Sequence, residues 1–218
     1  MIFQAFPKIP RLNRNCTITE KIDGTNAVIC IEEHPDGQHT LLAGSRNRWL
    51  TPDDDNFGFA TWVNSNALEL LKLGPGTQHG EWWGGSIQRG YGLKNKRFSL
   101  FNTARWGDPS ARPACCGIVP VLYEGPFDTQ IVRDCLSGLA LNGSAAAPGF
   151  RDPEGIVVYH HAAGSLFKVT IQGDEEGKHA EAHPKKERKP QMHKPKDPSK
   201  GGRRKEQLPF DGEDRRKK

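Results

Sequence analysis

The chain has 218 residues, 35% of them hydrophobic, which supports one domain-sized core, and it carries a formal net charge of +5. The sequence contains no run of about 18 apolar residues and no signal peptide, so we expect a cytoplasmic protein without a membrane partner. Five cysteines, an odd number without C-x-x-C spacing, predict reduced structural thiols rather than a zinc knuckle or a disulfide framework.

Two short strands joined by an Asp-Gly turn are the first elements that the sequence predicts. Residues 17–31 alternate apolar and polar side chains on either side of Lys21-Ile22-Asp23-Gly24, which indicates a β-hairpin. Lys21 is then expected at a strand end that faces a cleft. A further strand is predicted at residues 39–45.

A helix is predicted next in the chain. Residues 57–73 have the apolar spacing of a helix, which a Gly-Pro-Gly sequence at 74–76 ends. Asp53, Asp54 and Asp55 precede it, and acidic residues suit a helix N-terminus electrostatically. We therefore interpret the three aspartates as capping residues rather than as a metal cluster.

The rest of the folded part is predicted to be rich in strands. Strands are predicted at 78–83, 97–102, 117–123, 155–160 and 165–171, a helix at 129–141, and a mobile loop near a nucleotide at 88–92. Because strands dominate, the predicted fold class is α+β, with mainly antiparallel sheets and flanking helices, over residues 1–172.

Residues 173–218 differ from the rest in charge. Of the 31 basic and 26 acidic residues, 15 and 10 lie in this segment, so residues 1–172 hold 16 of each and no net charge. The segment is rich in proline and poor in apolar side chains, which predicts a disordered basic tail. Such a tail binds nucleic acid through counterion release, or it only keeps the chain soluble. An apolar patch at 207–210 is a candidate contact for a protein partner.

Lys21 is a candidate nucleophile, because a neutral lysine amine can attack the α-phosphate of a nucleoside triphosphate. The amine stays neutral only where a second cation or partial burial disfavours its charged form. Taken alone, a K-x-D-G string is more typical of a solvated lysine before a turn. Other residues must therefore decide between these two interpretations.

Four later residues have the chemistry that such a lysine needs. Arg46 is predicted at a strand end, where its guanidinium suits a bidentate contact with phosphate. Glu81 and Glu154 each lie beside a glycine that permits close backbone approach, and Lys168 supplies the second cation. Viewed singly, each of the four is as well explained as a surface or turn residue.

The order of these motifs resembles the covalent nucleotidyltransferase superfamily of ATP-dependent ligases and mRNA-capping enzymes, and most of all its RNA ligase branch. K-x-D-G is followed by S-R, G-E, an aromatic strand, E-G and a lysine strand, and the match spans residues 18–171. The sequence Glu-Lys-Ile-Asp-Gly-Thr-Asn at 20–26 is typical of that branch. The resemblance implies a nucleotidyltransferase domain of the ATP-grasp-like ligase kind over residues 1–172.

By that resemblance Lys21 bonds covalently to AMP and expels pyrophosphate, while Asp23 and Glu154 help to hold Mg²⁺ through its waters. Lys168 would neutralise the α-phosphate and keep the Lys21 amine deprotonated. The implied cofactors are ATP and Mg²⁺, which offsets triphosphate charge. AMP would then move to a 5′-phosphate end, and a 3′-hydroxyl would displace it to seal the strand, as in RNA repair.

The resemblance places five further residues around the nucleotide. Glu20 would contribute to cofactor binding, Arg46 would engage the acceptor end or a phosphate, and Glu81 would contact the ribose or a metal-bound water. Phe101 occupies the place of the adenine-stacking aromatic, since a purine is held mainly by apolar and π contact. Phe98 is expected on the same face and is the less favoured candidate.

The sequence departs from the family in its last motif, where Thr170 stands in place of a second lysine. One phosphate cation is then missing, and either Lys168 does both tasks, or Arg151 or a tail lysine substitutes, or adenylation is weakened. After residue 171 only the basic tail follows, without an oligonucleotide-binding barrel, so a minimal catalytic domain is expected.

Several functions fit these observations. The leading prediction is an ATP-dependent RNA ligase whose partners are RNA ends, with a nicked duplex as a second form of substrate. A DNA ligase or a GTP-using guanylyltransferase of the same superfamily is the alternative among enzymes. A non-catalytic protein that binds nucleic-acid ends with this fold is the alternative outside them.

Overall fold

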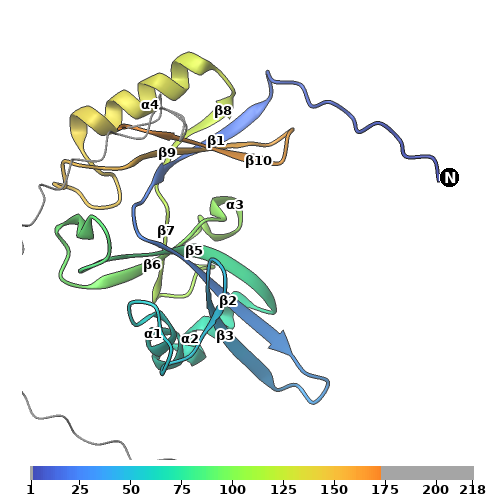
Figure 1. Ribbon diagram of the computed structural model, residues 1–218, viewed down its shortest axis with the longest axis vertical. Coiled ribbons are helices and arrows are strands. Elements are labelled where there is room, and N and C mark those ends of the chain that lie inside the picture. Colours follow the sequence, from blue (N-terminus) through green and yellow to red (C-terminus); the bar gives the residue numbers. More distant parts are fainter. Residues whose placement is uncertain (1, 173–218) are drawn as a thin grey trace, which may run out of the picture. The chain divides into compact units, whose positions relative to one another are not determined.

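The computed structural model describes residues 2–172, and the predicted basic tail, with its apolar patch at 207–210, lies outside them. The described residues form a mixed α+β fold with two β-sheets and few helices (Figure 1), as expected from the sequence. The strands are β1 (Asn15–Lys21), β2 (Thr25–Glu33), β3 (His39–Ser45), β4 (Trp49–Leu50), β5 (Gly76–Gly84), β6 (Lys96–Leu100), β7 (Cys116–Ile118), β8 (Val121–Pro126), β9 (Gly155–His160) and β10 (Ser165–Thr170). The helices are α1 (Phe59–Ser65), α2 (Ala67–Leu70), α3 (Thr103–Trp106) and α4 (Thr129–Asn142), with short 3-10 turns at η1 (Leu71–Leu73) and η2 (Gly90–Gly92).

A four-stranded antiparallel sheet has the order β10-β9-β1-β8. Alternate side chains of β1 and β9 pack with Leu139 of α4 in one apolar core, which includes Cys16, Ile18, Ile156 and Val158. Helix α4 lies along this face in Figure 1. The opposite face of the same strands carries the remaining side chains, Lys21 among them.

A six-stranded sheet has the order β4-β3-β2-β5-β6-β7, and of its pairings only β6 with β7 is parallel. Its larger core joins one face of the strands to α1, α2 and η1. That core includes Ala27, Ile29, Ala43, Leu50, Phe59, Val63, Leu70, Trp82, Phe98 and Leu100. Each sheet therefore has one face packed against helices, and on the other face of the six-stranded sheet Trp83 and Ser99 are also buried.

The predicted hairpin around Lys21 is wrong, because β1 and β2 belong to different sheets. β1 pairs with β8 and β9, and β2 pairs with β3 and β5. Gly24 sits at the crossing, where a Cβ atom would lie 2.5 Å from the carbonyl oxygen of Trp82 and 2.7 Å from the Cβ of Trp83. The glycine is required for this close approach to β5 and not for a hairpin turn.

The strand predicted at 117–123 is also wrong in extent, since the structure contains two strands in different sheets. β7 pairs with β6, whereas β8 pairs with β1. Pro120 lies between them, and a proline has no N–H to continue a ladder. The chain leaves one sheet at this point and enters the other.

The helix predicted at 57–73 is broken into three short pieces, α1, α2 and η1. The first break is at Asn66, whose φ of −113° is not helical. The carboxylate of Asp55 accepts hydrogen bonds from the backbone N–H groups of Ala60 and Thr61, so this aspartate caps α1 as predicted. Asp54 instead pairs with Arg48 on the surface.

Other predictions agree closely with the structure. The strands predicted at 39–45 and 155–160 coincide with β3 and β9, and the helix predicted at 129–141 is α4. All five cysteines are free thiols. Among the described residues, no helix combines the length and the apolar character that crossing a membrane requires.

Candidate active site

The lysine predicted to be the nucleophile lies on the face of the four-stranded sheet that α4 does not cover. Alternation along β1 places Thr19 and Lys21 opposite Ile18 in the α4 core. In register, Thr19 pairs with Val157, which pairs with Lys168. We call this set, Thr19, Lys21, Val157 and Lys168, the site face of the four-stranded sheet. The structure thus brings the two predicted lysines to one face.

Lys21 is held by one of the predicted carboxylates. Its Nζ donates to Glu154 Oε2 at 2.5 Å, and the side chains of Lys21 and Glu154 are 26% and 19% exposed. Glu154 directly precedes β9, whose first residue, Gly155, is the register partner of Lys21. The two predicted residues, 133 positions apart in sequence, are therefore in direct contact.

Glu81 reaches the same place from the six-stranded sheet. Its Oε1 accepts a hydrogen bond of 3.1 Å from the backbone N–H of Gly24. Burial raises the pKa of Glu81 to about 7; the nearby Lys21 charge and the Gly24 hydrogen bond act in the opposite direction, while Glu154 and Asp23 raise the pKa further. Three carboxyl groups and the lysine thus interact electrostatically.

Asp23 is oriented by two residues of the loop at 88–92, whose contact with Asp23 the sequence did not predict. Arg89 Nε donates to its carboxylate at 3.0 Å, and the Arg89 guanidinium also pairs with Asp152 at 2.6 Å. The backbone N–H of Asp23 donates to the hydroxyl of Tyr91 at 2.8 Å. Arg89 and Tyr91 therefore fix the segment that follows Lys21.

The loop at 88–92, predicted to be mobile, is instead packed against the protein. Tyr91 is 2% exposed, and its ring lies 4.6 Å from that of Phe150 and edge-on to Trp83 at 5.1 Å. A buried aromatic ring and the Arg89 ion pairs hold the segment. Arg89 was detectable in the sequence only as a basic residue in this loop.

The six-stranded sheet also has a site face, opposite its core. Since Ala27, Trp82 and Leu100 belong to the core, their neighbours Asn26, Glu81, Ser99 and Phe101 point to the other side. Asn26, Glu81 and Ser99 are paired in one row across β2, β5 and β6. These four side chains, together with Val28 and His79, form the site face of the six-stranded sheet.

The two aromatic candidates for adenine stacking differ in environment. Phe101 is 38% exposed, and its backbone N–H continues the ladder by donating to the carbonyl of His79. Phe98 is fully buried in the core, with its ring 5.3 Å from that of Phe59. The expectation that Phe98 shares a face with Phe101 is wrong, because side chains three positions apart on a strand point to opposite sides.

The two remaining cofactor-binding candidates differ in exposure: Arg46 is exposed and Glu20 is buried. Arg46 is exposed directly after β3, whose last residue, Ser45, pairs with Ala27 next to Asn26. Glu20 is 1% exposed, and its carboxylate accepts hydrogen bonds from Ser144 Oγ at 2.6 Å and from the backbone N–H of Ala146 at 2.8 Å. The Glu20 carboxylate therefore anchors the loop after α4, and burial raises its pKa.

Thr170 lies in the row of the nucleophile. It pairs with Gly155, which pairs with Lys21. Lys168 is exposed on β10 and belongs to the next row, opposite Val157. Position 170, where the family has a second lysine, therefore lies level with Lys21, with β9 between them. Lys168 lies one row further along the same face.

The metal prediction rests on Asp23 and Glu154. No cluster of three or more His, Cys, Asp or Glu side chains with metal-binding geometry occurs within residues 2–172. Mg²⁺ usually keeps several waters and uses one or two carboxylates together with substrate phosphates, rather than an all-protein cage. Two carboxylates beside the lysine are compatible with that mode of binding.

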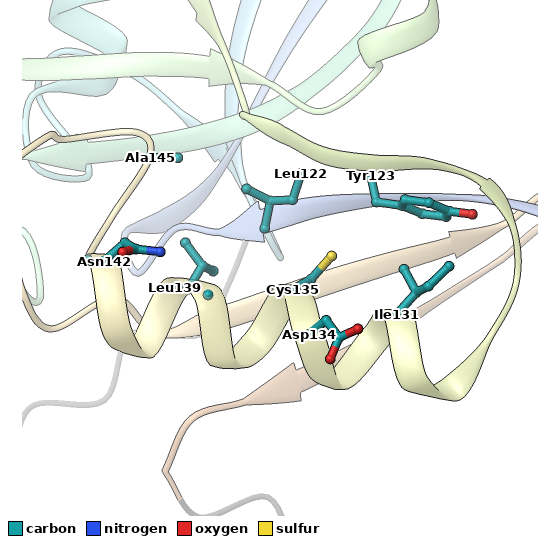
Figure 2. Close-up of a pocket in the computed structure, with 10 residues that line it drawn as sticks. Leu122, Tyr123, Ile131, Asp134, Cys135, Leu139, Asn142 and Ala145 are labelled. Atoms are coloured by element: carbon teal, nitrogen blue, oxygen red, sulfur yellow. The ribbon is translucent and has the colours of Figure 1, made fainter.

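A pocket of about 460 Å³ lies away from these residues, between α4 and β8. Figure 2 shows Leu122 and Tyr123 of β8 opposite Ile131, Cys135 and Leu139 of α4. Its walls are largely apolar and contain no lysine or arginine, so they do not suit a triphosphate. None of the predicted site residues lines it.

Comparisons with known proteins address the family and the fold of the chain. The family model described as RNA ligase matches residues 14–170. None of the curated proteins compared with the chain matches it.

Solved structures of an RNA ligase from Naegleria gruberi are similar to the chain in fold. A ligand-free variant is 20% identical, with a TM-score of 0.51 over 72% of this chain and 50% of that one. A variant with ATP and Mn is 17% identical, with a TM-score of 0.54 over 73% and 50%. A variant with AMP and Mn is 18% identical, with the same TM-score and coverage. The chain therefore spans about half the length of these solved chains.

Proposed function

The chain belongs to the RNA ligase family, and we propose that it joins RNA ends with ATP through a covalent lysyl-AMP intermediate on Lys21. The observation that carries the proposal is the contact of Lys21 with Glu154, beside Glu81 and on the same sheet face as Lys168. The fold would be the nucleotidyltransferase domain of the ATP-grasp-like ligase kind.

In the first step, the neutral Lys21 amine attacks the α-phosphorus of ATP. The N–P bond forms, the bond between the α-phosphorus and its bridging oxygen breaks, and pyrophosphate leaves. The Lys21 side chain donates to Glu154, so this ion pair must open before the attack. Lys168, on the same face, would stabilise charge on the phosphate.

In the later steps, an oxygen of an RNA 5′-phosphate attacks the lysyl-AMP phosphorus, and Lys21 leaves as the amine. The RNA 3′-hydroxyl then attacks the activated 5′-phosphorus, and AMP is released with its bonding electrons. Arg46 at the end of β3 would hold the terminal phosphate or the acceptor end, since a guanidinium binds phosphate in two-point contacts. Phe101 would hold the adenine by stacking.

Asp23 and Glu154 would hold Mg²⁺ through its waters. When bound, the metal would offset the triphosphate charge and polarise the reacting phosphorus. Arg89 keeps the Asp23 carboxylate in place, and Glu81, with its raised pKa, would contact the ribose or a metal-bound water. The chain's own groups thus position each carboxylate before a ligand arrives.

Self-adenylation tests the proposal directly. The full chain is incubated with α-labelled ATP and Mg²⁺, and separately with α-labelled GTP, and then separated by denaturing electrophoresis. We expect a labelled band with ATP that disappears in Lys21→Ala. Lys72→Ala, which alters an exposed lysine paired with Glu69 on the surface, should label like the parent. No band with either nucleotide would refute the ligase proposal, and a band with GTP alone would favour a guanylyltransferase.

The substrate is part of the same proposal. Ligation of nicked duplexes with RNA or DNA on the 3′-hydroxyl side, compared with single-stranded RNA ends, would separate RNA from DNA sealing. RNA repair in the cytoplasm, and a protein partner at residues 207–210, rest on the sequence expectation.

A further inference from the structure

Trp49 is a large apolar side chain that the proposed reaction does not use and that the fold leaves exposed. It is 57% exposed, whereas Trp82, Trp83 and Trp106 are each less than 5% exposed. Its neighbour in β4, Leu50, belongs to the core. Burial of an indole removes a large apolar surface from water and is favourable, so its position on the surface requires an explanation.

The indole lies on the site face of the six-stranded sheet. Trp49 pairs with Gly44, and the next pair, Leu50 with Ala43, points into the core. A Cβ atom on Gly44 would meet the Trp49 ring at 3.1 and 3.2 Å. The ring therefore lies against the backbone of Gly44, on the side opposite the core, and the absence of a side chain at position 44 makes room for it.

Trp49 and Phe101 lie in one row across the sheet. Gly44 pairs with Val28, Val28 pairs with His79, and the His79 carbonyl accepts from the backbone N–H of Phe101. Four strand spacings separate the two rings, or about 19 Å. The aromatic residue proposed to hold the adenine and the exposed tryptophan therefore mark two ends of one sheet face.

The immediate surroundings of Trp49 are polar and basic. The preceding residues are Ser45, Arg46, Asn47 and Arg48, and all but Ser45 are exposed. Arg48 pairs with Asp54, whereas within residues 2–172 the Arg46 side chain makes no ion pair. A protein partner would require a broader apolar patch than one ring among basic and amide groups. An aromatic ring beside arginine is instead typical of a site that binds single-stranded nucleic acid.

We propose that Trp49 stacks on a base of the RNA strand whose terminal phosphate Arg46 holds, so that the β3–β4 edge of the sheet forms an RNA-binding platform. This inference rests on the proposed function. Stacking requires no particular base, since every base has a π-face, so the platform would hold the strand without reading its sequence. Arg46 would supply the charge and Trp49 the apolar contact.

The experiment measures binding of a 5′-phosphorylated single-stranded oligouridylate to the full chain by two readouts. The first is the dissociation constant over a range of salt concentrations. The second is quenching of tryptophan fluorescence by acrylamide, which reports mainly on Trp49, because the other four of the five tryptophans are buried or half-buried. We expect RNA to shield Trp49 from acrylamide, and Trp49→Leu to weaken binding about ten-fold.

Three variants separate stacking from other effects. Trp49→Phe keeps a ring and should bind within about three-fold of the parent. Phe167→Leu is the matched control, since Phe167 is 55% exposed and pairs with core residue Val158, on the α4 side of the other sheet. Trp49→Leu should leave the salt dependence unchanged, whereas Arg46→Ala should reduce its slope by about 0.7.

The proposal is overturned if RNA leaves acrylamide quenching unchanged, which is the result expected when RNA binds only to residues 173–218. It is also overturned if Trp49→Leu binds like the parent, or if Phe167→Leu loses as much affinity. A dimer of the parent that Trp49→Leu dissolves, seen by light scattering, would assign the ring to contact between copies instead.

Self-adenylation distinguishes the failure of this inference from the failure of the proposed function. Trp49→Leu should form the labelled band at the parent rate, because the ring is not part of the nucleotide contacts. If the chain labels itself but RNA does not shield Trp49, the RNA platform is refuted and the ligase proposal stands. If RNA shields Trp49 but the chain does not label itself, the platform stands and the ligase chemistry is refuted.

Discussion

The four-stranded and six-stranded sheets are each covered by helices on one face, but their site faces carry different chemistry. Lys21 and Lys168 lie on the four-stranded sheet, which supplies the nucleophile and a second cation. Glu81 and Phe101 lie on the six-stranded sheet, which supplies a carboxyl group and an aromatic ring. The site is complete only where Gly24 brings the two sheets together, so its chemistry depends on that junction more than on either sheet.

The junction itself should be the most sensitive position in the molecule. Gly24→Ala adds a Cβ 2.5 Å from the backbone oxygen of Trp82, and neither backbone can yield without moving β5. We expect a loss of about 3 kcal/mol or more in the free energy of unfolding. Urea denaturation followed by circular dichroism measures it.

The control for this change is another glycine on a surface helix. Gly138 in α4 has no atom within 4 Å of an added Cβ, and alanine is a better helix former than glycine. Gly138→Ala should therefore stabilise the chain by up to about 1 kcal/mol. Equal stability of Gly24→Ala and the parent would contradict the close approach described for the junction.

The second-largest expected effect concerns the ion pairs that Arg89 makes with Asp23 and Asp152. Arg89→Met removes the contacts with Asp23 and Asp152 but keeps the length of the side chain. We expect self-adenylation at saturating ATP to fall about ten- to a hundred-fold, because Asp23 loses its orientation beside Lys21. Single-turnover labelling gives the rate.

Arg133→Met, an exposed change on α4, serves as the control and should label like the parent. If Arg89→Met lost stability and labelling in proportion, with full activity in the folded fraction, Arg89 would be a structural residue only. A normal labelling rate would show that Asp23 needs no partner for orientation.

Glu81 allows the electrostatics of the junction to be tested by pH. Its pKa is raised by burial to about 7, whereas an unfolded glutamate titrates near 4.5. Below about pH 4.5 the carboxyl is protonated in both the folded and the unfolded chain, so it does not change the free energy of unfolding. Between about pH 4.5 and 7 the unfolded chain ionises first, so the free energy of unfolding falls as pH rises, and it levels off above 7.

Glu81→Gln removes this titration while keeping an oxygen to accept from Gly24. We expect the variant to match the parent at pH 4.5 and to be more stable by about 1 kcal/mol at pH 8, a figure reduced because Glu81 is only partly buried. Denaturation curves at both pH values measure the difference. A constant difference across this range would contradict the raised pKa of Glu81.

The contrast between local and long-range information explains which features the sequence predicts. Alternation over a few residues locates β3 and β9 correctly, because each strand's pattern reflects one buried face. Which sheet a strand joins depends on residues that are distant in the sequence. The Asp-Gly pair indicates a hairpin, yet Gly24 is needed because of Trp82, 58 positions later in the printed sequence.

The same limit applies to the site. The order of motifs names Lys21, Glu81 and Glu154, and the structure brings all three together. Arg89 was missed, because its role is visible only through contacts with Asp23 and Asp152 across the fold. The expectation for Phe98 is wrong although alternation along β6 separates it from Phe101, because residues three positions apart on a strand face opposite sides.

The smallest expected effect concerns the departure from the family pattern on the four-stranded sheet. Thr170 is level with Lys21, two strands away across β9, or about 10 Å by strand spacing. Thr170→Lys would add a cation on the side of the sheet that carries the nucleophile. It should lower the ATP concentration for half-maximal self-adenylation about three-fold, because a second charge at this distance contributes only modestly through solvent.

Thr170→Gln introduces a side chain nearly as long as that of lysine but without its charge, so it separates the effect of charge from the effect of size. Labelling over a range of ATP concentrations, at low and at moderate salt, gives the comparison. The gain in Thr170→Lys should shrink as salt rises, since exposed charges are screened over about 10 Å at 0.1 M. An equal gain in both variants would assign it to packing, and no gain in either would show that Lys168 already supplies the charge that the α-phosphate needs.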